Sequence, residues 1–512
     1  MKKLFSKISA LALLALPVAT SCELDQVSPV NPGPEAVVNT MDDAESWRLG
    51  MYTALRTASS FEESDLQTDN FVLTNQDGNQ HGMTYSWTFG NTNVDAQTTV
   101  YANLYAMVRY ANHVMAYVPQ VLANGTGLTA ADTLEVDQIL GEAYWLRAYS
   151  YSRLAAYFCD RYDPATAGQT LGMVIENEPV MEGSDVNEQP SRVSLDSTYR
   201  FIKSDLAKAR SLMNGSNPAD FMDATVAAYM MPEEALDLLE ARVALATCDY
   251  QRAVELCQGI IASGKYPLIT TTEGLQDMWL NDRGSEVIFQ LYCTKDEPGP
   301  SFGSFTAPDP SLTSQLGFPA YVPQIQPSME ALGRFEQTDI RFAATFFQGW
   351  SYAAYNANGY DANSAFSILL GKYPGNPVLK TYTTDVYNMR KLFRAPEAYL
   401  IAAEAEYRQG HMGEALSYYN ALHHTARGAS ELTTTDNFLN DLCDEYTREY
   451  IGEGLLFGVL KRLNMGMSRG GNQQVGTQTN GTVISIEPDN MRWTWNIPQQ
   501  DLNANPNMEG NW

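Results

Sequence analysis

The sequence predicts a mainly α-helical protein whose body is built from tetratricopeptide-like helical hairpins and is interrupted by long irregular insertions. The clearest hairpin spans residues 393–428, where apolar and small residues recur at helical spacing on both sides of Gly410. Residues 233–264 repeat the pattern. Each hairpin carries one alanine in each helix at equivalent positions: Ala241 and Ala253, Ala403 and Ala415. Such small residues let two helices pack closely.

The other regular segments follow in order along the chain. Amphipathic periodicity predicts helices over residues 41–57, 94–122, 133–158, 194–214 and 438–462. Ser194 is suited to be the N-cap of the fourth of these. The segment 285–291 is a short apolar run of the kind that forms a strand.

Two long segments lack helical periodicity. Residues 61–93 and 292–389 accumulate glycine, asparagine and aromatic residues, and the second is also rich in proline and serine. Insertions of this length exceed what a connection needs, and they usually carry function. We therefore expect a single domain over residues 41–512, in which these insertions form the ligand-binding face and residues 479–512 form an irregular tail.

The N-terminus reads as a secretory signal followed by a lipid anchor. Lys2, Lys3 and Lys7 precede an apolar run over residues 8–18, which is too short to span a membrane. Small residues then lead directly into Cys22, an arrangement that resembles a bacterial lipoprotein signal. We expect residues 1–21 to be removed, Cys22 to be lipid-modified, and the proline-rich residues 22–40 to form an extended tether.

Composition narrows the classes of partner and chemistry. The chain has 33 Lys and Arg against 60 Asp and Glu, a net charge of -27, which disfavours nucleic acid and anionic lipid surfaces. None of the five histidines stands in a metal-ligand pattern, and the sequence contains no nucleophile elbow, P-loop or dinucleotide-binding turn. We expect no metal, no cofactor and no catalytic residues.

Several motifs, in order, resemble those of the SusD/RagB family of outer-membrane nutrient-binding lipoproteins. The matching segments are Cys22 with its tether, Glu142–Leu154, Ser263–Leu268, Glu286–Phe289, Thr338–Arg341, Arg394–Glu406, Glu449 with Glu453 and Gly454, Lys461 with Arg462, Ile497 with Pro498, and Asn505–Asn507. The sequence departs from the family pattern at Leu456, at Val459 and over residues 159–162, as a divergent member would.

The resemblance implies a function as well as a fold. It implies a tetratricopeptide-like body with a shallow binding face, anchored in the outer membrane and facing the cell exterior. It also implies a lid-like partnership with a SusC-like TonB-dependent transporter, to which bound glycan is delivered. Some relatives bind peptide instead, so an oligopeptide-binding protein of the RagB type remains the alternative. Two further hypotheses come from other functional classes: a glycosidase, and a pure scaffold of helical repeats.

Sugar capture requires flat aromatic rings flanked by polar side chains, because a pyranose has an apolar face and a rim of hydroxyls. Covering roughly 100 Å2 of ring face contributes on the order of 2.5 kcal/mol. Aromatic residues in the insertions are therefore the candidates, together with nearby amides. The predicted ligand-binding residues are Asn75, Trp87, Tyr321, Trp350, Tyr352, Tyr355 and Asn356.

Overall fold

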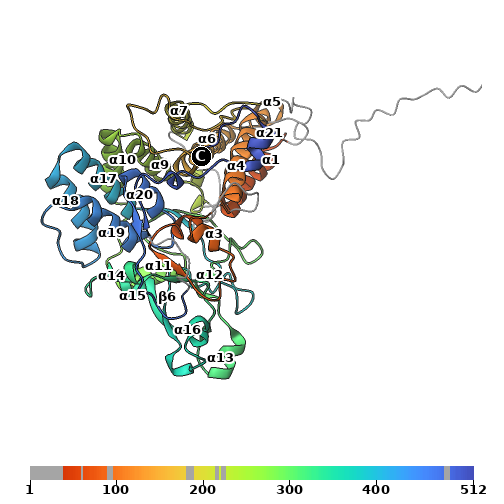
Figure 1. The fold of residues 1–512 in the computed structure, drawn as a ribbon. Coiled ribbons are helices and arrows are strands. Elements are labelled where there is room, and N and C mark those ends of the chain that lie inside the picture. Colours follow the sequence, from red (N-terminus) through yellow and green to blue (C-terminus); the bar gives the residue numbers. More distant parts are fainter. Residues whose placement is uncertain are drawn as a thin grey trace, which may run out of the picture.

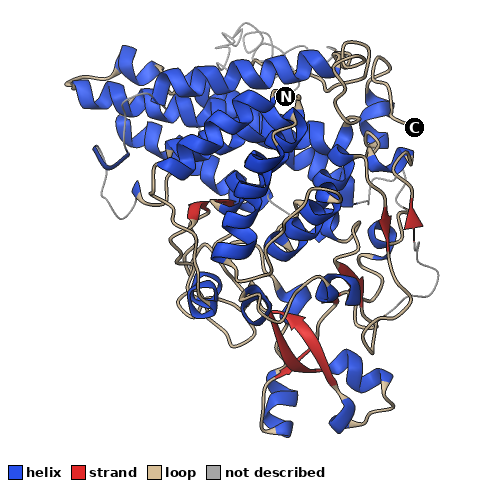
Figure 2. Cartoon of the chain, turned by 90° about the vertical axis from the view of Figure 1, so that its left-hand side faces the viewer, coloured by secondary structure: helices blue, strands red, loops and turns tan. Residues whose placement is uncertain are grey.

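The computed structural model describes residues 38–58, 62–88, 96–179, 189–213, 218–220, 227–477 and 485–512. Helices form most of the molecule, and a smaller lobe that contains short strands projects from one end (Figures 1 and 2). The predicted mainly α fold is confirmed. The predicted signal peptide, Cys22 and most of the predicted tether lie outside the described residues.

Four long helices form the N-terminal half of the body: α1 (Met41–Ala58), α4 (Ala96–Tyr117), α6 (Ala130–Phe158) and α7 (Leu195–Met213), with the short α5 (Gln120–Asn124) after α4. Helix α6 packs against both α4 and α7. Thr129 and Asp132 form a capping box at the start of α6. The predicted N-cap of α7 is confirmed, because Ser194 Oγ accepts a hydrogen bond from the backbone N–H of Ser197 at 3.1 Å.

Two helical hairpins continue this array. The first pairs α9 (Glu233–Ala246) with α10 (Tyr250–Ala262), and the second pairs α17 (Pro396–Gln409) with α18 (Met412–Asn420). The four alanines at the equivalent positions are all fully buried. Helix α10 packs against α17, so the two hairpins are neighbours. Gly410 ends α17 with a left-handed backbone, φ 85°, which a glycine adopts without strain.

The second hairpin differs from the expectation at both ends. Residues Lys391–Arg394 form strand β7, which pairs with β2 (Val287–Gln290), so helix α17 starts at Pro396 rather than at Phe393. After α18 the chain continues as a π-helical turn over Ala421–Ala426. His423 lies in this turn and is buried, with its Nδ1 2.6 Å from a carboxylate oxygen of Glu445.

Buried charges join the hairpins to the second insertion. Arg394 bonds to the carboxylates of Glu286, Glu449 and Glu453 at 2.7–3.0 Å. Arg341, from the insertion, bonds to Glu449 at 3.1 Å. Burial would raise the pKa of Glu449, but the three guanidinium groups of Arg427, Arg394 and Arg341 outweigh it and hold that pKa well below its ordinary value. Motif residues that carry the family resemblance thus meet in one structural network.

The C-terminal part closes the core. It contains α19 (Phe438–Tyr450), α20 (Leu456–Leu463), β8 (Met467–Ser468), β9 (Ser485–Ile486), η5 (Met491–Trp493) and α21 (Gln499–Ala504). Trp495, in the tail, stacks on Tyr157 of α6 at a centroid distance of 4.4 Å. Among the helices of the described residues, none is sufficiently long and apolar to cross a membrane.

The two predicted insertions come together in the projecting lobe and around its base. Strand β1 (Phe71–Leu73) of the first pairs antiparallel with β4 (Ile325–Pro327) of the second. The sequence predicts an irregular second insertion, and this prediction is wrong, because the insertion contains strands and short helices. The elements not yet given are α2 (Glu62–Asp65), α3 (Gly82–Tyr85), η2 (Pro218–Asp220), α11 (Thr272–Leu280), α12 (Gly303–Thr306), α13 (Pro310–Leu316), β3 (Ala320–Tyr321), α14 (Met329–Gly333), α15 (Arg341–Thr345), β5 (Phe346–Ser351), α16 (Tyr352–Ala357), η3 (Ala362–Ser364) and β6 (Phe366–Leu370). Elements this short lie below the length at which sequence periodicity is informative.

Candidate functional site

A three-stranded sheet forms the frame of the lobe. Its order is β3-β5-β6, with β3 parallel to β5 and β5 antiparallel to β6. Helices α13 and α16 lie with this sheet at the far end of the molecule (Figure 1). Asp309 caps α13 by accepting a hydrogen bond from the Leu312 N–H at 2.9 Å, and Asp361 caps η3 through the Asn363 N–H at 3.1 Å.

One face of the sheet carries Tyr321. Its ring lies 5.3 Å from that of Phe347, and it is half-buried. Gly349 makes this arrangement possible, because a Cβ at that position would lie 2.9 Å from Leu369 and 3.1 Å from the Tyr321 ring. Burial raises the pKa of the Tyr321 hydroxyl.

Trp350 lies on the opposite face and is buried, with 1% of its surface exposed. Its Nε1 donates a hydrogen bond to the carbonyl of Ala362 at 3.2 Å, and Leu312 and Leu316 of α13 pack against the small core it forms. The prediction that Trp350 offers a ring face to a ligand is therefore wrong. The ring instead holds α13, α16 and η3 onto the sheet.

Five rings lie around the buried Trp350, and we call this set the aromatic tip. Phe318, Tyr360 and Phe366 are exposed, whereas Tyr352 and Tyr355 are half-buried. Tyr355 contacts Trp350 at a centroid distance of 5.1 Å and contacts Tyr360 at 5.4 Å. Phe318 and Phe366 lie nearly parallel, with 23° between their planes, and are 40% and 45% exposed. Tyr360 is 61% exposed. The tip thus presents flat rings to solvent on a rigid support.

Amide groups accompany these rings. Asn356 shares one side of α16 with Tyr352 and Tyr355, and its side chain makes no hydrogen bond to any residue that the structure describes. Asn75 plays a different part. Its Nδ2 donates to the carbonyl of Ala353 at 3.2 Å, which ties the first insertion to the start of α16. Asn356 is free to contact a ligand, whereas Asn75 positions the helix that carries it.

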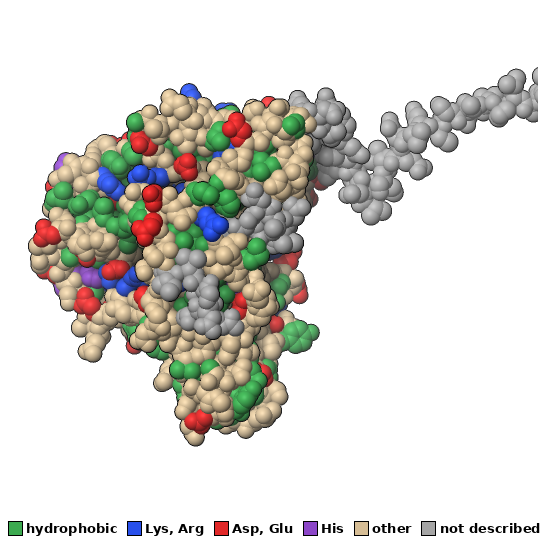
Figure 3. All heavy atoms as spheres, viewed as in Figure 1, with side chains coloured by type: hydrophobic (Ala, Val, Ile, Leu, Met, Phe, Trp, Pro, Cys, Tyr) green, Lys and Arg blue, Asp and Glu red, His purple; other side chains and the backbone are tan. Residues whose placement is uncertain are grey.

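The lobe is almost uncharged in a strongly acidic protein. Residues 298–329 contain one charged side chain, Asp309, and residues 342–371 contain one, Asp361. Both carboxylates serve as helix caps. Hydrogen bonds lower the pKa of Asp361; the largest effect comes from the hydroxyl of Ser364, and the backbone N–H of Asn363 adds to it. Figure 3 shows hydrophobic side chains on this lobe and no lysine or arginine on the face in view. The surface suits a neutral ligand that has apolar ring faces.

Trp87 does not belong to this site. It is fully buried, and it contacts Trp493 at 4.9 Å in an edge-on geometry and Phe457 at 6.2 Å. Its place in the helical core excludes a ring face for sugar, so this prediction is also wrong. The tail residue that covers it lies some 400 positions later in the sequence, and local sequence contains no trace of that contact.

The structure divides the remaining predicted residues between two faces. Tyr352, Tyr355 and Asn356 lie together at the tip, while Tyr321 lies across the sheet with Phe347. The sequence reasoning did not select Tyr360, Phe318 or Phe366 as ligand-binding residues. For Tyr360 a signal was present, because it follows Asn358 and Gly359 in a polar turn where a ring has little to pack against.

Comparisons with known proteins agree with this architecture. A family model described as starch-binding, associating with the outer membrane, matches residues 37–231, and a model described as the SusD family matches residues 264–512. No curated protein matches the chain significantly.

Solved structures also resemble the chain. A SusD superfamily protein from Bacteroides thetaiotaomicron superposes with a TM-score of 0.74 at 24% identity, covering 92% of this chain and 100% of that one. A SusD-like carbohydrate-binding protein from Bacteroides vulgatus gives 0.72 at 18% identity, covering 92% and 97%. A laminarin-binding SusD-like protein gives 0.66 at 16% identity, covering 92% and 99%. These likenesses establish the fold.

Proposed function

The chain belongs to the SusD/RagB family, and from that premise we propose that it is a cell-surface lipoprotein that binds a neutral glycan and delivers it to a SusC-like TonB-dependent transporter. The aromatic tip is the proposed binding site. Tyr352, Tyr355 and Asn356 are its central residues, and Tyr360, Phe318 and Phe366 extend it.

The observation that carries the glycan proposal is the chemistry of the tip. Exposed rings cover C–H faces of pyranoses, and the unengaged amide of Asn356 can donate to and accept from sugar hydroxyls. Because this part of the chain carries almost no charge, a neutral ligand can bind without removing water from charged side chains, which would cost free energy. Structural relatives described as carbohydrate-binding and laminarin-binding support the same class of ligand.

Tyr321 and Asn75 take supporting places in this proposal. Tyr321 is half-exposed on the other side of the sheet and forms a second, weaker ring surface beside Phe347. Asn75 fixes the start of α16 and so orients Tyr352 and Tyr355. Binding proteins of this family do their work without catalysis, and we propose the same for this chain.

An extended peptide is the alternative ligand. Peptide recognition usually uses charged side chains or an open sheet edge to hold the backbone. The tip has neither a lysine nor an arginine within residues 342–371, so it has no cation for a peptide carboxylate. The glycan proposal is therefore favoured.

Delivery requires attachment to the outer membrane beside the transporter. We propose that Cys22 carries the lipid, with residues 22–40 as the tether. Replacing Cys22 with Ser should move the protein from the membrane fraction to the soluble fraction. Co-purification with a SusC-like transporter from outer membranes tests the partnership, and its absence under mild detergent would count against it.

Native affinity electrophoresis tests the ligand class. Gels containing neutral polysaccharides with different linkages should include at least one that retards the protein, while polysaccharide-free gels should not. If no glycan retards the protein and peptides co-purify with it, the peptide alternative replaces the proposal. Release of sugar from a retarding polysaccharide by the purified protein would contradict the non-catalytic role.

A further inference from the structure

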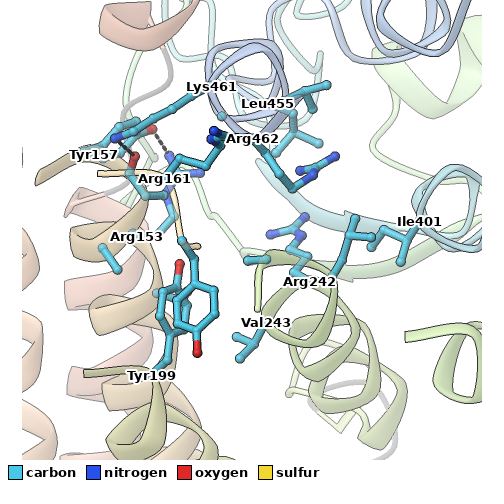
Figure 4. A pocket seen from close by; sticks show the side chains of 18 of the residues that line it. Arg153, Tyr157, Arg161, Tyr199, Arg242, Val243, Ile401, Leu455, Lys461 and Arg462 are labelled. Atoms are coloured by element: carbon cyan, nitrogen blue, oxygen red, sulfur yellow. Dashed lines mark hydrogen bonds between the residues drawn. The ribbon is translucent and has the colours of Figure 1, made fainter. Parts of the chain in front are cut away.

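A cavity of about 160 Å3 lies in the helical body, far from the aromatic tip. Its walls come from the C-terminal end of α6, from α9 and α17, and from the start of α20. These helices lie at the opposite end of the molecule from α13 and α16 (Figure 1). Figure 4 shows side chains of α6 and α9 facing one another across the open space. The proposed glycan site makes no use of this cavity.

The charge of the cavity is opposite to that of the protein. Five cationic side chains line it, against the two carboxylates of Asp160 and Glu397. The five are Arg153, Arg161, Arg242, Lys461 and Arg462. In a chain with a net charge of -27, such a concentration of cations in one concave place requires an explanation.

Two of the arginines are already neutralised. Arg242 forms a bidentate ion pair with Glu397, and Arg462 forms one with Glu404, in which Nη2 lies 2.5 Å from Oε2. Both carboxylates are buried. These pairs fix α9 and α20 against α17 and need no ligand.

Arg153 and Arg161 are different, because neither has a carboxylate partner among the described residues. Arg153 lies 4.8 Å above the ring of Tyr157 and donates a hydrogen bond to its hydroxyl. Stacking of Tyr157 on Trp495 holds this arrangement in place. Arg161 is exposed and has neither a hydrogen-bond nor an ion-pair partner in the part of the chain that the structure describes. Neither of these two guanidinium groups at the cavity is therefore neutralised by a carboxylate of the described residues.

Lys461 removes the main obstacle to an anion there. The C-terminal end of α6 would repel negative charge. Lys461 is buried and donates to the last carbonyls of this region, those of Ala156 at 2.9 Å and Cys159 at 2.5 Å. Burial lowers its pKa to about 8, although the thiol of Cys159 and the carboxylate of Asp160 act in the opposite direction, and no carboxylate in the described residues lies within ion-pair distance of its ammonium. Lys461 therefore neutralises the partial negative charge at the end of α6, and a nearby anion would stabilise its charged form.

Between these charges the cavity wall is apolar. Val243 and Ile401 lie on one side, and the ring of Tyr199 lies on another. A free inorganic anion would leave this surface without a partner. A ligand that joins one carboxylate to a compact ring uses both parts of the cavity.

We propose that this cavity binds a ring of monosaccharide size bearing a single carboxylate, with Arg153 and Arg161 holding the carboxylate. Arginine suits the role because its planar fork matches a carboxylate in two parallel hydrogen bonds. The proposal is independent of the glycan site at the tip, which is neutral and lies on another part of the molecule.

Isothermal titration calorimetry of the full chain tests the proposal with three probes: sodium glucuronate, glucose and N-acetylalanine. Glucuronate should bind and glucose should not, because glucose has the ring but lacks the charge. N-acetylalanine, which has one carboxylate and no ring, distinguishes the source of the carboxylate. If it binds more weakly than glucuronate, an acidic sugar is the ligand class. If it binds more tightly, the carboxylate of a peptide or amino acid is the class, and the ring requirement is overturned.

Arg161→Gln and Arg153→Gln should each weaken glucuronate binding about tenfold or more, since each removes a charge-assisted hydrogen bond. Arg283→Gln is the matched control, because Arg283 is exposed and paired with Asp277 elsewhere. Arg161 has no hydrogen-bond or ion-pair partner among the described residues, so its replacement should leave the unfolding temperature unchanged. Equal binding by the Arg161→Gln variant, equal binding of glucose, or no binding of either carboxylate would overturn the proposal. Both variants should still bind the neutral polysaccharide. This result would show that the loss of glucuronate binding is independent of the glycan site at the aromatic tip.

Discussion

Replacing Trp350 with alanine should destabilise the strand lobe, and this consequence separates a core residue from a ligand platform. The buried ring removes roughly 150–250 Å2 from water, which at about 25 cal/mol per Å2 contributes on the order of 4–6 kcal/mol. Measured truncations of buried aromatic residues cost about 3–5 kcal/mol. The carbonyl of Ala362 would also lose the hydrogen bond from Nε1. We expect a loss of about 3–5 kcal/mol in the free energy of unfolding of the lobe.

Hydrogen exchange is the suitable assay, because the lobe has its own small core and can open without the helical body. Amides of β5 and β6 should exchange much faster in Trp350→Ala, while those of α6 should be unchanged. Tyr360→Ala is the control, since this ring is mostly exposed and, among the aromatic rings of the described residues, it contacts Tyr355 alone. Wild-type exchange in Trp350→Ala together with lost glycan binding would refute the reasoning and restore Trp350 as a platform.

Three further predictions concern stability. Arg394→Ala should lower the free energy of unfolding by about 3–5 kcal/mol, measured with urea, because three buried carboxylates each lose one of their cationic partners. The exposed Arg283→Ala should cost less than about 1 kcal/mol. The pKa of Glu449 is depressed in the folded protein, so this carboxylate contributes its full stabilisation above pH 4.5, the ordinary pKa of a glutamate, and the stabilisation is lost as the pH falls below that value. Calorimetry should therefore show an unfolding temperature that falls as the pH is lowered below 4.5, and the fall should be smaller in Glu449→Gln. A flat profile in the parent protein would contradict this sign. Gly349→Ala should cost about 1–3 kcal/mol and displace the ring of Tyr321, visible as increased exposure of its hydroxyl to titration; an unchanged titration would show that the strand accommodates the added methyl group.

The helical body could be anticipated from the sequence because its signals are local. Helical spacing and paired alanines specified both hairpins, and the alanines are buried as that packing requires. Each motif of the family resemblance could also be recognised within a short stretch of sequence. The contact of these motifs in one buried network around Arg394 and Glu449, however, depends on segments far apart in the chain.

The site was less predictable because burial of an aromatic ring is decided by distant partners. Trp350 lies in a polar stretch beside Gly349, yet Leu312 and Leu316 of α13 cover it. Trp87 is covered by Trp493. The short strands of the lobe, two to six residues long, left no periodicity that could have revealed which rings face inward.

Glycan affinity of tip variants measures the central claim most directly. The protein should first be matched to the neutral polysaccharide that retards it most, and a soluble oligosaccharide of that polymer should then be titrated. The double variant Tyr355→Ala/Tyr360→Ala should bind roughly 10–100-fold more weakly, because it loses one to two ring platforms. Tyr382→Ala, which removes a 70% exposed ring outside the tip, should bind as the parent does. Undiminished affinity in the double variant, or an equal loss in Tyr382→Ala, would contradict the assignment of the aromatic tip as the glycan-binding site.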